Sequence, residues 1–332
     1  MPERERPNRN SRKMNLRQTE IAGTNLLAVL GPTASGKSDL AIRLAALLDG
    51  EIISADSMQI YRGLDIGTAK PPQDILRNPR HHLVDTLDIS ERLDVFAYKT
   101  AAEQTIADIS SRGKLPILSG GTGLYARAVI YGLDQVPSDR ELRQKLEDEF
   151  AGEDGTVRLR TKMETEDVED LRRWYDNPRR LIRSYEVFLL TGKPLAQFQK
   201  LWADAEPRYN TLSLRLEWDR EILKKRISER TVRMLDSGWI EEARVMIGKG
   251  LLTSPTARQS LGYDVIGEYL AGQISRKEME DRIINETWHY ARRQMTWFRN
   301  KHPEAVSVQM PADAAEIAGL ASEFFGAGTA GN

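Results

Sequence analysis

The segment that most restricts the fold is GPTASGKS, residues 31–38, which directly follows the apolar run LLAVL at residues 26–30. A glycine, four residues, a second glycine and then Lys-Ser form the phosphate-binding loop pattern. Such a loop joins a buried strand to a helix, so that backbone N–H groups and the positive end of the helix face one anion. The chain is therefore expected to hold a phosphate group at one edge of an α/β core.

The residue types in this loop suit a diphosphate neutralised by a metal ion. Lys37 adds a full positive charge, and the hydroxyl of Ser38 is a suitable ligand for Mg²⁺. A chance glycine-rich turn is the alternative, but the strand and helix on either side disfavour it. We predict Mg²⁺ as the cofactor, Ser38 as its protein ligand, and a phosphate site, which the family resemblance given below makes a diphosphate site, made of Gly31, Thr33, Ala34, Ser35, Gly36, Lys37 and Ser38.

Strand-like and helical segments alternate along the first third of the chain, which predicts a parallel sheet flanked by helices in a doubly wound arrangement. A strand pattern recurs in TLSLRLEW, residues 211–218, and returns the chain to that sheet. One long helix is expected at 219–246, then a loop at 248–263. The last long helix opens with Ser275 and Glu278 as a capping box, and its apolar stripe is expected in the core; the stripe is Ile284, Trp288, Ala291, Met295 and Phe298.

The composition changes in the middle of the chain, where charged, arginine-rich helical text replaces the strands. We therefore expect an inserted all-helical domain at 137–207 and an α/β core made of 23–136 and 208–325. The polar, aperiodic start at 1–22 predicts a disordered arm, and the glycine-rich end at 326–332 a flexible tail.

The composition restricts the chemistry. The chain has no cysteine, which excludes disulfides, thiol nucleophiles and zinc held by cysteines, and its four histidines are scattered. With 48 basic and 49 acidic residues, any basic surface must be a local arrangement. No apolar run approaches the roughly 20 residues that a membrane helix needs, and the start lacks a signal-peptide pattern. We expect a cytoplasmic enzyme.

A carboxylate at a second strand end would mark a nucleotide hydrolase, because it would help to hold Mg²⁺. The strand-like LPIL at 115–118 runs instead into SGGTG, without an acid. Asp56 follows the predicted strand EIISA, which comes directly after the helix of the phosphate loop. At that strand end the Asp56 carboxylate would face a second substrate and accept a proton from it. The alternative for Asp56 is that it only caps a turn.

Two functions remain open at this point. One is a small-molecule kinase, in which Asp56 activates a hydroxyl group and Arg226, Arg230 and Arg233 close over ATP. The other is a transferase whose donor carries a diphosphate that is not part of a nucleotide. The three arginines lie on a predicted helix, where such charges are usually a solvated face.

The insertion contains a helix with clear ends. Asn177 suits the N-cap, Pro178 the first helical position, and Gly192 the residue after the last turn. The first two turns carry arginines, which oppose the helix dipole at a cost of about 0.3–1 kcal/mol each. This liability suggests an anionic partner such as RNA phosphates, while a solvated helix balanced by nearby acids is the alternative.

These segments together resemble the bacterial tRNA dimethylallyltransferases, also called tRNA isopentenyltransferases. The stretch SADSMQIYRGLDIGTAKP at 54–71 and the late RRQMTWFR at 292–299 are the most specific, and the resemblance spans roughly residues 25–305. It also rests on the phosphate loop and on HHLVD at 81–85, SGGTGLY at 119–125, NPRRLIRSYEV at 177–187 and ARQSLGY at 257–263.

The resemblance implies a P-loop NTPase-like core that moves a dimethylallyl group from dimethylallyl diphosphate to the N6 amine of the adenosine immediately 3′ of the anticodon. It implies three catalytic residues: Asp56 as the base, Thr122 near the acceptor adenine and Arg258 at the diphosphate. The implied partners are the donor and the tRNA anticodon stem-loop, and we expect a monomer. The implied tRNA contacts are Asp56, Ser57, Met58, Gln59, Arg143, Arg179, Arg180, Leu181, Ile182, Arg183, Gln259, Gly262 and Tyr263.

The chain departs from the family pattern in two places. It has RRLIRSYEV where many relatives have QRIQRALEV, and Asp264 where they have a basic or polar residue.

Three alternative functions differ in what they require. A kinase would consume ATP, an enzyme acting on free AMP would leave the arginine-rich insertion without an evident use, and a non-catalytic RNA-binding module would not need the phosphate loop.

Overall fold

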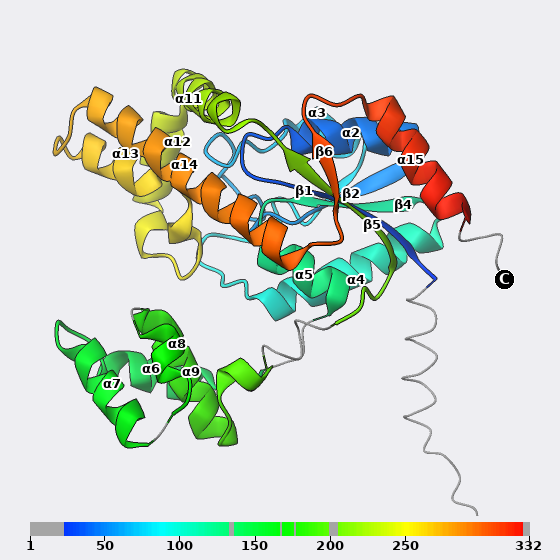
Figure 1. Ribbon diagram of the computed structural model, residues 1–332. Coiled ribbons are helices and arrows are strands. Elements are labelled where there is room, and N and C mark those ends of the chain that lie inside the picture. The colour runs from blue at the N-terminus through cyan, green and yellow to red at the C-terminus, as the bar shows by residue number, and fades with distance from the viewer. Residues whose placement is uncertain (1–22, 133–135, 167, 176, 199–204, 328–332) are drawn as a thin grey trace, which may run out of the picture. The chain divides into compact units, whose positions relative to one another are not determined.

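The computed structural model describes residues 23–132, 136–166, 168–175, 177–198 and 205–327 (Figure 1). They belong to two compact units: the chain up to Ile130 together with the chain from Pro207 onward, and Tyr131–Glu206. The predicted insertion at 137–207 overlaps the second unit. The predicted arm at 1–22 and the last five residues of the predicted tail lie outside the described residues.

The first unit is built on a six-stranded sheet in which all neighbours are parallel and the order is β3-β2-β4-β1-β5-β6. Strand β1 lies at the centre and its apolar residues are fully buried, as its sequence predicts. This sheet confirms the predicted α/β fold class. The strands are β1 Asn25–Leu30, β2 Gly50–Ser54, β3 His81–His82, β4 Leu115–Gly120, β5 Asn210–Glu217 and β6 Val306–Gln309.

Helices cover both faces of this sheet (Figure 1). Helices α2 (Lys37–Leu47) and α15 (Ala314–Ala327) lie on one face, and a shared apolar core joins them to β1 and β5. Helices α4 (Val95–Ser111) and α5 (Gly123–Tyr131) lie on the other face, and the short α3 spans Gln73–Arg77. Strand β6 and α15 were not predicted individually, and α15 continues two residues into the predicted tail.

The prediction of one uninterrupted helix at 219–246 is wrong, because the chain forms two helices there. Gly238 has a φ of 100°, a left-handed conformation that ends the first helix and caps the second. The predicted loop that follows contains two short 3₁₀ segments, and an additional helix, α13, begins at its end. The elements are α11 Arg220–Asp236, α12 Trp239–Gly248, η1 Leu251–Thr253, η2 Ala257–Gln259, α13 Tyr263–Leu270 and α14 Arg276–Lys301.

Helix α14 begins as predicted, since the Ser275 hydroxyl accepts a hydrogen bond from the backbone N–H of Glu278 at 3.2 Å. Its apolar stripe packs in the core: Ala291 and Phe298 are fully buried, and the other stripe residues are partly so. The polar residues beside this stripe remain available to line a cavity.

The described part of the second unit is entirely helical. Its helices are α6 Arg140–Glu149, α7 Gly155–Thr165, α8 Leu171–Trp174 and α9 Pro178–Thr191. Helix α9 has the predicted ends, because Asn177 Oδ1 accepts from Arg180 N at 3.1 Å and Gly192 has a φ of 66°. This unit has its own apolar core, which includes Leu146 and Leu159. Within the described residues, none of the helices has the length and apolarity needed to span a membrane.

Candidate active site

The phosphate loop turns sharply between β1 and α2. Gly36 and Ala34 adopt left-handed φ values of 85° and 61°, and Gly36 is followed directly by the first turn of α2. No side chain of the described residues caps this turn, so its N–H groups and the positive end of the helix dipole are available to an anion. Lys37 folds back over the loop and donates to the carbonyl oxygen of Pro32 at 3.2 Å.

Burial beneath the loop lowers the pKa of Lys37 to about 8, although the negative charge of Asp56 acts in the opposite direction. The ammonium group is thus short of compensating negative charge in the unliganded protein. A bound diphosphate would supply that charge, which makes Lys37 a favourable anion-binding group.

Trp218, which directly follows β5, and two arginines of α11 hold the phosphate loop. Arg226 Nε donates to Ala34 O at 3.0 Å, and Trp218 Nε1 donates to Ser35 O at 2.9 Å. Arg230 Nη1 donates to Thr33 Oγ1 at 3.1 Å. These bonds use oxygens of the loop as acceptors and do not occupy its N–H groups.

Gln294 of α14 connects the phosphate loop to the glycine turn after β4. Its Oε1 accepts from Thr33 N and its Nε2 donates to Gly121 O, both at 2.8 Å. A Cβ on Gly121 would lie 2.4 Å from Gln294 Nε2, so only glycine permits this approach. Helix α14 is therefore tied to two loops at the carboxyl edge of the sheet.

Asp56 lies directly after β2 at the same edge. Its Oδ1 accepts from Met58 N at 2.9 Å and from Gln59 N at 3.4 Å, which fixes the carboxylate on the turn. Its Oδ2 accepts no hydrogen bond from the residues that the structure describes. One oxygen therefore caps the turn, while the residue also lines a cavity; its role as a base stays a prediction.

Thr122 supports this turn from the glycine-rich segment after β4. Its Oγ1 accepts from Ser57 N at 3.0 Å, and its own N–H donates to Ala55 O at 3.0 Å. A Cβ on Gly120 would lie only 2.1 Å from Ala55 O, so the two strand ends can meet only because residue 120 is glycine. The SGGTG segment thus holds Asp56 and Ser57 in place.

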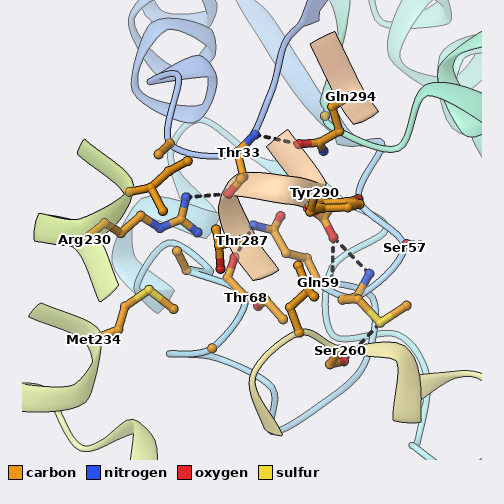
Figure 2. A pocket seen from close by; sticks show the side chains of 18 of the residues that line it. Thr33, Ser57, Gln59, Thr68, Arg230, Met234, Ser260, Thr287, Tyr290 and Gln294 are labelled. Carbon is orange, nitrogen blue, oxygen red and sulfur yellow. Dashed lines mark hydrogen bonds between the residues drawn. The ribbon is translucent and has the colours of Figure 1, made fainter. Parts of the chain in front are cut away.

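These elements enclose a cavity of about 370 Å³ that lies wholly within the first unit. The phosphate loop forms one wall, the turn after Asp56 another, and helices α11 and α14 contribute further side chains (Figure 2). The predicted residues that line it are Thr33, Ala34, Lys37, Ser38, Asp56, Ser57, Met58, Gln59 and Gln259.

Other predicted site residues lie outside the lining. Gly31, Ser35 and Gly36 belong to the phosphate loop but do not line the cavity. Arg258 is exposed on η2, and its side chain does not line the cavity. Gly262 caps α13 with a φ of 86°.

The side chains of two predicted RNA contacts are buried in the protein. Tyr263 is 1% exposed, packs edge-on against Trp239 and donates from its hydroxyl to Glu242 at 2.6 Å. Leu181 is 0% exposed in the core of the second unit. Their apolar surface is used for packing, so neither side chain is available to bind RNA; the neighbouring Ile182 is only partly buried.

The predicted RNA-binding arginines of the second unit differ in their surroundings. Arg143 and Arg183 both donate to Oε2 of Glu186 at 2.8 Å, and that glutamate is fully buried. The Arg180 guanidinium lies 4.4 Å from the ring centroid of Trp174 and is exposed, as is Arg179. Arg143 therefore joins α6 to α9, Arg183 joins α9 to the segment at Val136 and Pro137, and the other two arginines face solvent.

Several lining residues were not predicted for this site: Thr287, Tyr290, Arg293 and Gln294 of α14. Arg230 was considered only for a kinase. The available signal was the spacing of Tyr290 and Gln294, which are four residues apart beside the apolar stripe and therefore share a helix face.

A family model described as IPP transferase matches residues 59–301, well over half of the chain. The chain belongs to the IPP transferase family. A tRNA dimethylallyltransferase of Geobacter sulfurreducens is 41% identical over 305 residues, which cover 91% of this chain and 97% of that protein. One from Acetivibrio thermocellus is 42% identical over 278 residues, which cover 83% of this chain and 88% of that protein.

Solved structures of the family agree with this fold. The tRNA isopentenylpyrophosphate transferase of Bacillus halodurans has a TM-score of 0.68 at 34% identity, covering 92% of this chain and 98% of that one. A eukaryotic dimethylallyltransferase acting on tRNA has a TM-score of 0.73 at 25% identity, covering 86% of this chain and 74% of that one. The family resemblance of the sequence is thus confirmed.

Proposed function

We propose that this protein transfers a dimethylallyl group from dimethylallyl diphosphate to the N6 amine of the adenosine immediately 3′ of the anticodon in tRNA, releasing diphosphate. The observation that carries the proposal is that the phosphate loop and Asp56 line the same cavity. The names of the relatives, which are tRNA dimethylallyltransferases, support it. An ATP-consuming kinase and an AMP prenyltransferase have no such support.

The donor reacts by breaking its allylic C–O bond, which places negative charge on the leaving diphosphate. Preorganised donors that face this charge lower the barrier. The N–H groups of Ala34, Gly36, Lys37 and Ser38 would hold the diphosphate, because those of Thr33 and Ser35 already donate to Gln294 and Pro32. The Lys37 side chain would add a positive charge, and Arg230 would approach from α11. Arg258 would reach the diphosphate only if its side chain turned in from its exposed position on η2.

The residues at the loop fit a Mg²⁺ ion. The Ser38 hydroxyl lines the cavity and makes no side-chain hydrogen bond among the described residues, and Mg²⁺ typically takes one or two protein oxygens together with phosphate oxygens. Bound there, Mg²⁺ would neutralise the diphosphate. The described residues hold no cluster of three acidic or histidine ligands, which agrees with a metal shared with the substrate.

The acceptor amine is a weak nucleophile because its lone pair is shared with the adenine ring, so a base beside it assists. Asp56 Oδ2 would accept the N6 proton as the new C–N bond forms, while Oδ1 keeps the carboxylate in place. Thr122 would act through Ser57. We assign the acceptor contacts to Ser57, Met58, Gln59 and Gln259, and contacts with the rest of the anticodon stem-loop to Arg179 and Arg180.

The adenosine must leave its stack to enter the cavity, at a cost of a few kcal/mol that RNA contacts elsewhere must offset. The proposal includes action as a monomer in the cytoplasm, where tRNA is modified. Size-exclusion chromatography with light scattering in the presence of tRNA tests the oligomeric state.

The experiment that tests the function is a transfer assay with labelled dimethylallyl diphosphate and Mg²⁺. We expect label in unmodified tRNA and none in AMP, with no consumption of ATP in a parallel reaction. Label in AMP alone, or ATP consumption that depends on an acceptor, would overturn the proposal.

The role of Asp56 is tested with Asp56→Asn, which keeps a side-chain oxygen for the turn but removes the base. Loss of a general base typically lowers the rate by about 10²–10⁴-fold. Transfer should fall by this factor while diphosphate affinity stays unchanged. A matched Asp49→Asn change, at a carboxylate that is 79% exposed, should alter neither. Equal loss of affinity and rate in Asp56→Asn would assign Asp56 a structural role.

A further inference from the structure

The face of α14 that lines the cavity carries an aromatic ring between the two substrate-binding walls. Gln294 is fixed to the phosphate loop and to the glycine turn by its two 2.8 Å hydrogen bonds. Tyr290 lies four residues earlier on the same helix, so its Cβ is roughly 5–6 Å from that of Gln294. Tyr290 is thus about one helical turn away from the residue that touches the phosphate loop.

Tyr290 points into the cavity. Figure 2 shows it between Gln294 and the segment that carries Ser57 and Gln59. The other aromatic residue among the lining residues is Trp239, which is 2% exposed and packs edge-on against Tyr263. Tyr290 is half-buried and therefore presents more of its ring to a substrate than Trp239 does.

We propose that the ring of Tyr290 stabilises the positive charge that develops on the dimethylallyl group during transfer. This inference rests on the proposed function. The C–O bond of the donor breaks with its electron pair leaving on the diphosphate, and the lone pair of N6 forms the new C–N bond. The N6 proton passes to Asp56. Between these events the five-carbon fragment is electron-poor, and the face of an aromatic ring attracts such a cation.

The location of the ring fits this part of the reaction. The reacting carbon is bonded directly to the diphosphate, and the diphosphate is held by the loop that Gln294 touches. The carbon must also face the amine beside Asp56. A group that lies between the loop and the Asp56 turn is therefore next to the carbon that changes partners, and Tyr290 has that position.

The hydroxyl group of Tyr290 is unsuited to an acid–base role. Burial and the negative charge of Asp56 raise its pKa to about 12, while hydrogen bonding from Thr122 and Gln294 opposes the rise. The phenol stays neutral at physiological pH. The guanidinium carbon of Arg293 lies 5.8 Å from the ring centroid, so the ring already interacts with one cation.

The test separates the ring's charge distribution from its shape. Phenylalanine and its mono-, di- and trifluorinated analogues are introduced at position 290 of the full chain, because each fluorine weakens the attraction between ring and cation. The measured quantity is the single-turnover rate of prenyl transfer to unmodified tRNA. We expect Tyr290→Phe to react within about three-fold of the wild type, and the logarithm of the rate to fall steadily with fluorine number, by roughly ten-fold over the series.

Two controls keep the result interpretable. The affinity for inorganic diphosphate with Mg²⁺ and the thermal unfolding midpoint should be the same across the series, because fluorination barely changes the ring's size. Tyr290→Leu removes the ring and should lower the transfer rate at least as far as trifluorination does.

Equal rates across the fluorinated series would overturn the inference, as would a loss of more than ten-fold in Tyr290→Phe, which would assign the effect to the hydroxyl group. Either result in an active wild-type enzyme leaves the proposed function intact. Absence of transfer by the wild type would instead reject the proposed function itself.

Discussion

Helices α11 and α9 both carry closely spaced arginines, yet the structure uses them in opposite ways. In α11, Arg226 and Arg230 donate to oxygens of the phosphate loop, and Arg230 lines the cavity. In α9, Arg183 donates to the fully buried carboxylate of Glu186. A buried carboxylate neutralises the charge of its arginine partner, whereas an arginine that donates to a neutral oxygen keeps a net positive charge that can attract a ligand.

The largest effect is expected from Glu186→Leu. It leaves Arg143 and Arg183 without their shared acceptor. Breaking a buried ion pair from one side costs about 3–5 kcal/mol, and the low end, about 3 kcal/mol, is expected because the two arginine side chains are 32% and 23% exposed. Urea denaturation of the full chain, followed by a probe in the second unit, should show this loss. The exposed Glu147→Gln change on α6 is the control and should cost less than about 0.5 kcal/mol. If both variants were equally stable, the arginines of α9 would not be structural.

The first unit also contains a buried carboxylate paired with an arginine, so its unfolding free energy should depend on pH in the acid range. Glu51 is 5% exposed, and hydrogen bonds from Arg112, helped by His82, lower its pKa from 4.5 to about 2. The resulting stability is fully present above pH 4.5 and is lost as the pH falls toward 2; in total it is about 3 kcal/mol. Between pH 6 and pH 3 the unfolding free energy of the wild type should fall by about 2 kcal/mol more than that of Glu51→Gln. Parallel curves for the two proteins would contradict this.

Arg230→Met tests the α11 side of the comparison. A charged hydrogen-bond donor to an anion is typically worth about 1.5–3 kcal/mol, so diphosphate should bind roughly ten- to a hundred-fold more weakly, measured by calorimetry with Mg²⁺. The unfolding free energy should change little, because no buried carboxylate loses its partner. Lys225→Met removes a 78% exposed cation from the same helix and should leave the affinity unchanged. Equal affinities in both variants would make α11 a solvated face.

The smallest effect is expected from Arg179→Ala, at an exposed arginine of α9. A single phosphate contact should weaken tRNA binding only a few-fold and lower the salt slope by about one, with no change in stability. Arg183→Ala should instead destabilise the second unit, because it removes one of the positively charged partners of the buried Glu186 carboxylate. Lys145→Ala, on the exposed face of α6, is the control for tRNA binding. An unchanged slope in Arg179→Ala would remove Arg179 from the RNA-binding surface.

Local patterns predicted the elements that depend on neighbouring residues. The phosphate loop, the buried β1, the capped start of α14 and both ends of α9 follow from residue spacing, because backbone conformation and capping are decided within a few positions. The break at Gly238 was missed because a glycine within a helical pattern signals a break only when its φ is known. The burial of the Tyr263 and Leu181 side chains could not be predicted, because a family motif does not separate residues that bind from residues that pack.

The sequence alone determined that this chain has an α/β core with the phosphate-loop pattern, that Asp56 follows the second strand, and that the chain resembles tRNA dimethylallyltransferases. The tertiary structure decided which charges are available. Asp56 faces the cavity because Gly120 lets two strand ends meet, Gln294 and Tyr290 reach it from a helix more than 200 positions away, and Glu186 neutralises arginines that look free in the sequence. These relations join residues distant along the chain, and the energy of a charge depends on burial and partners that only folding brings together.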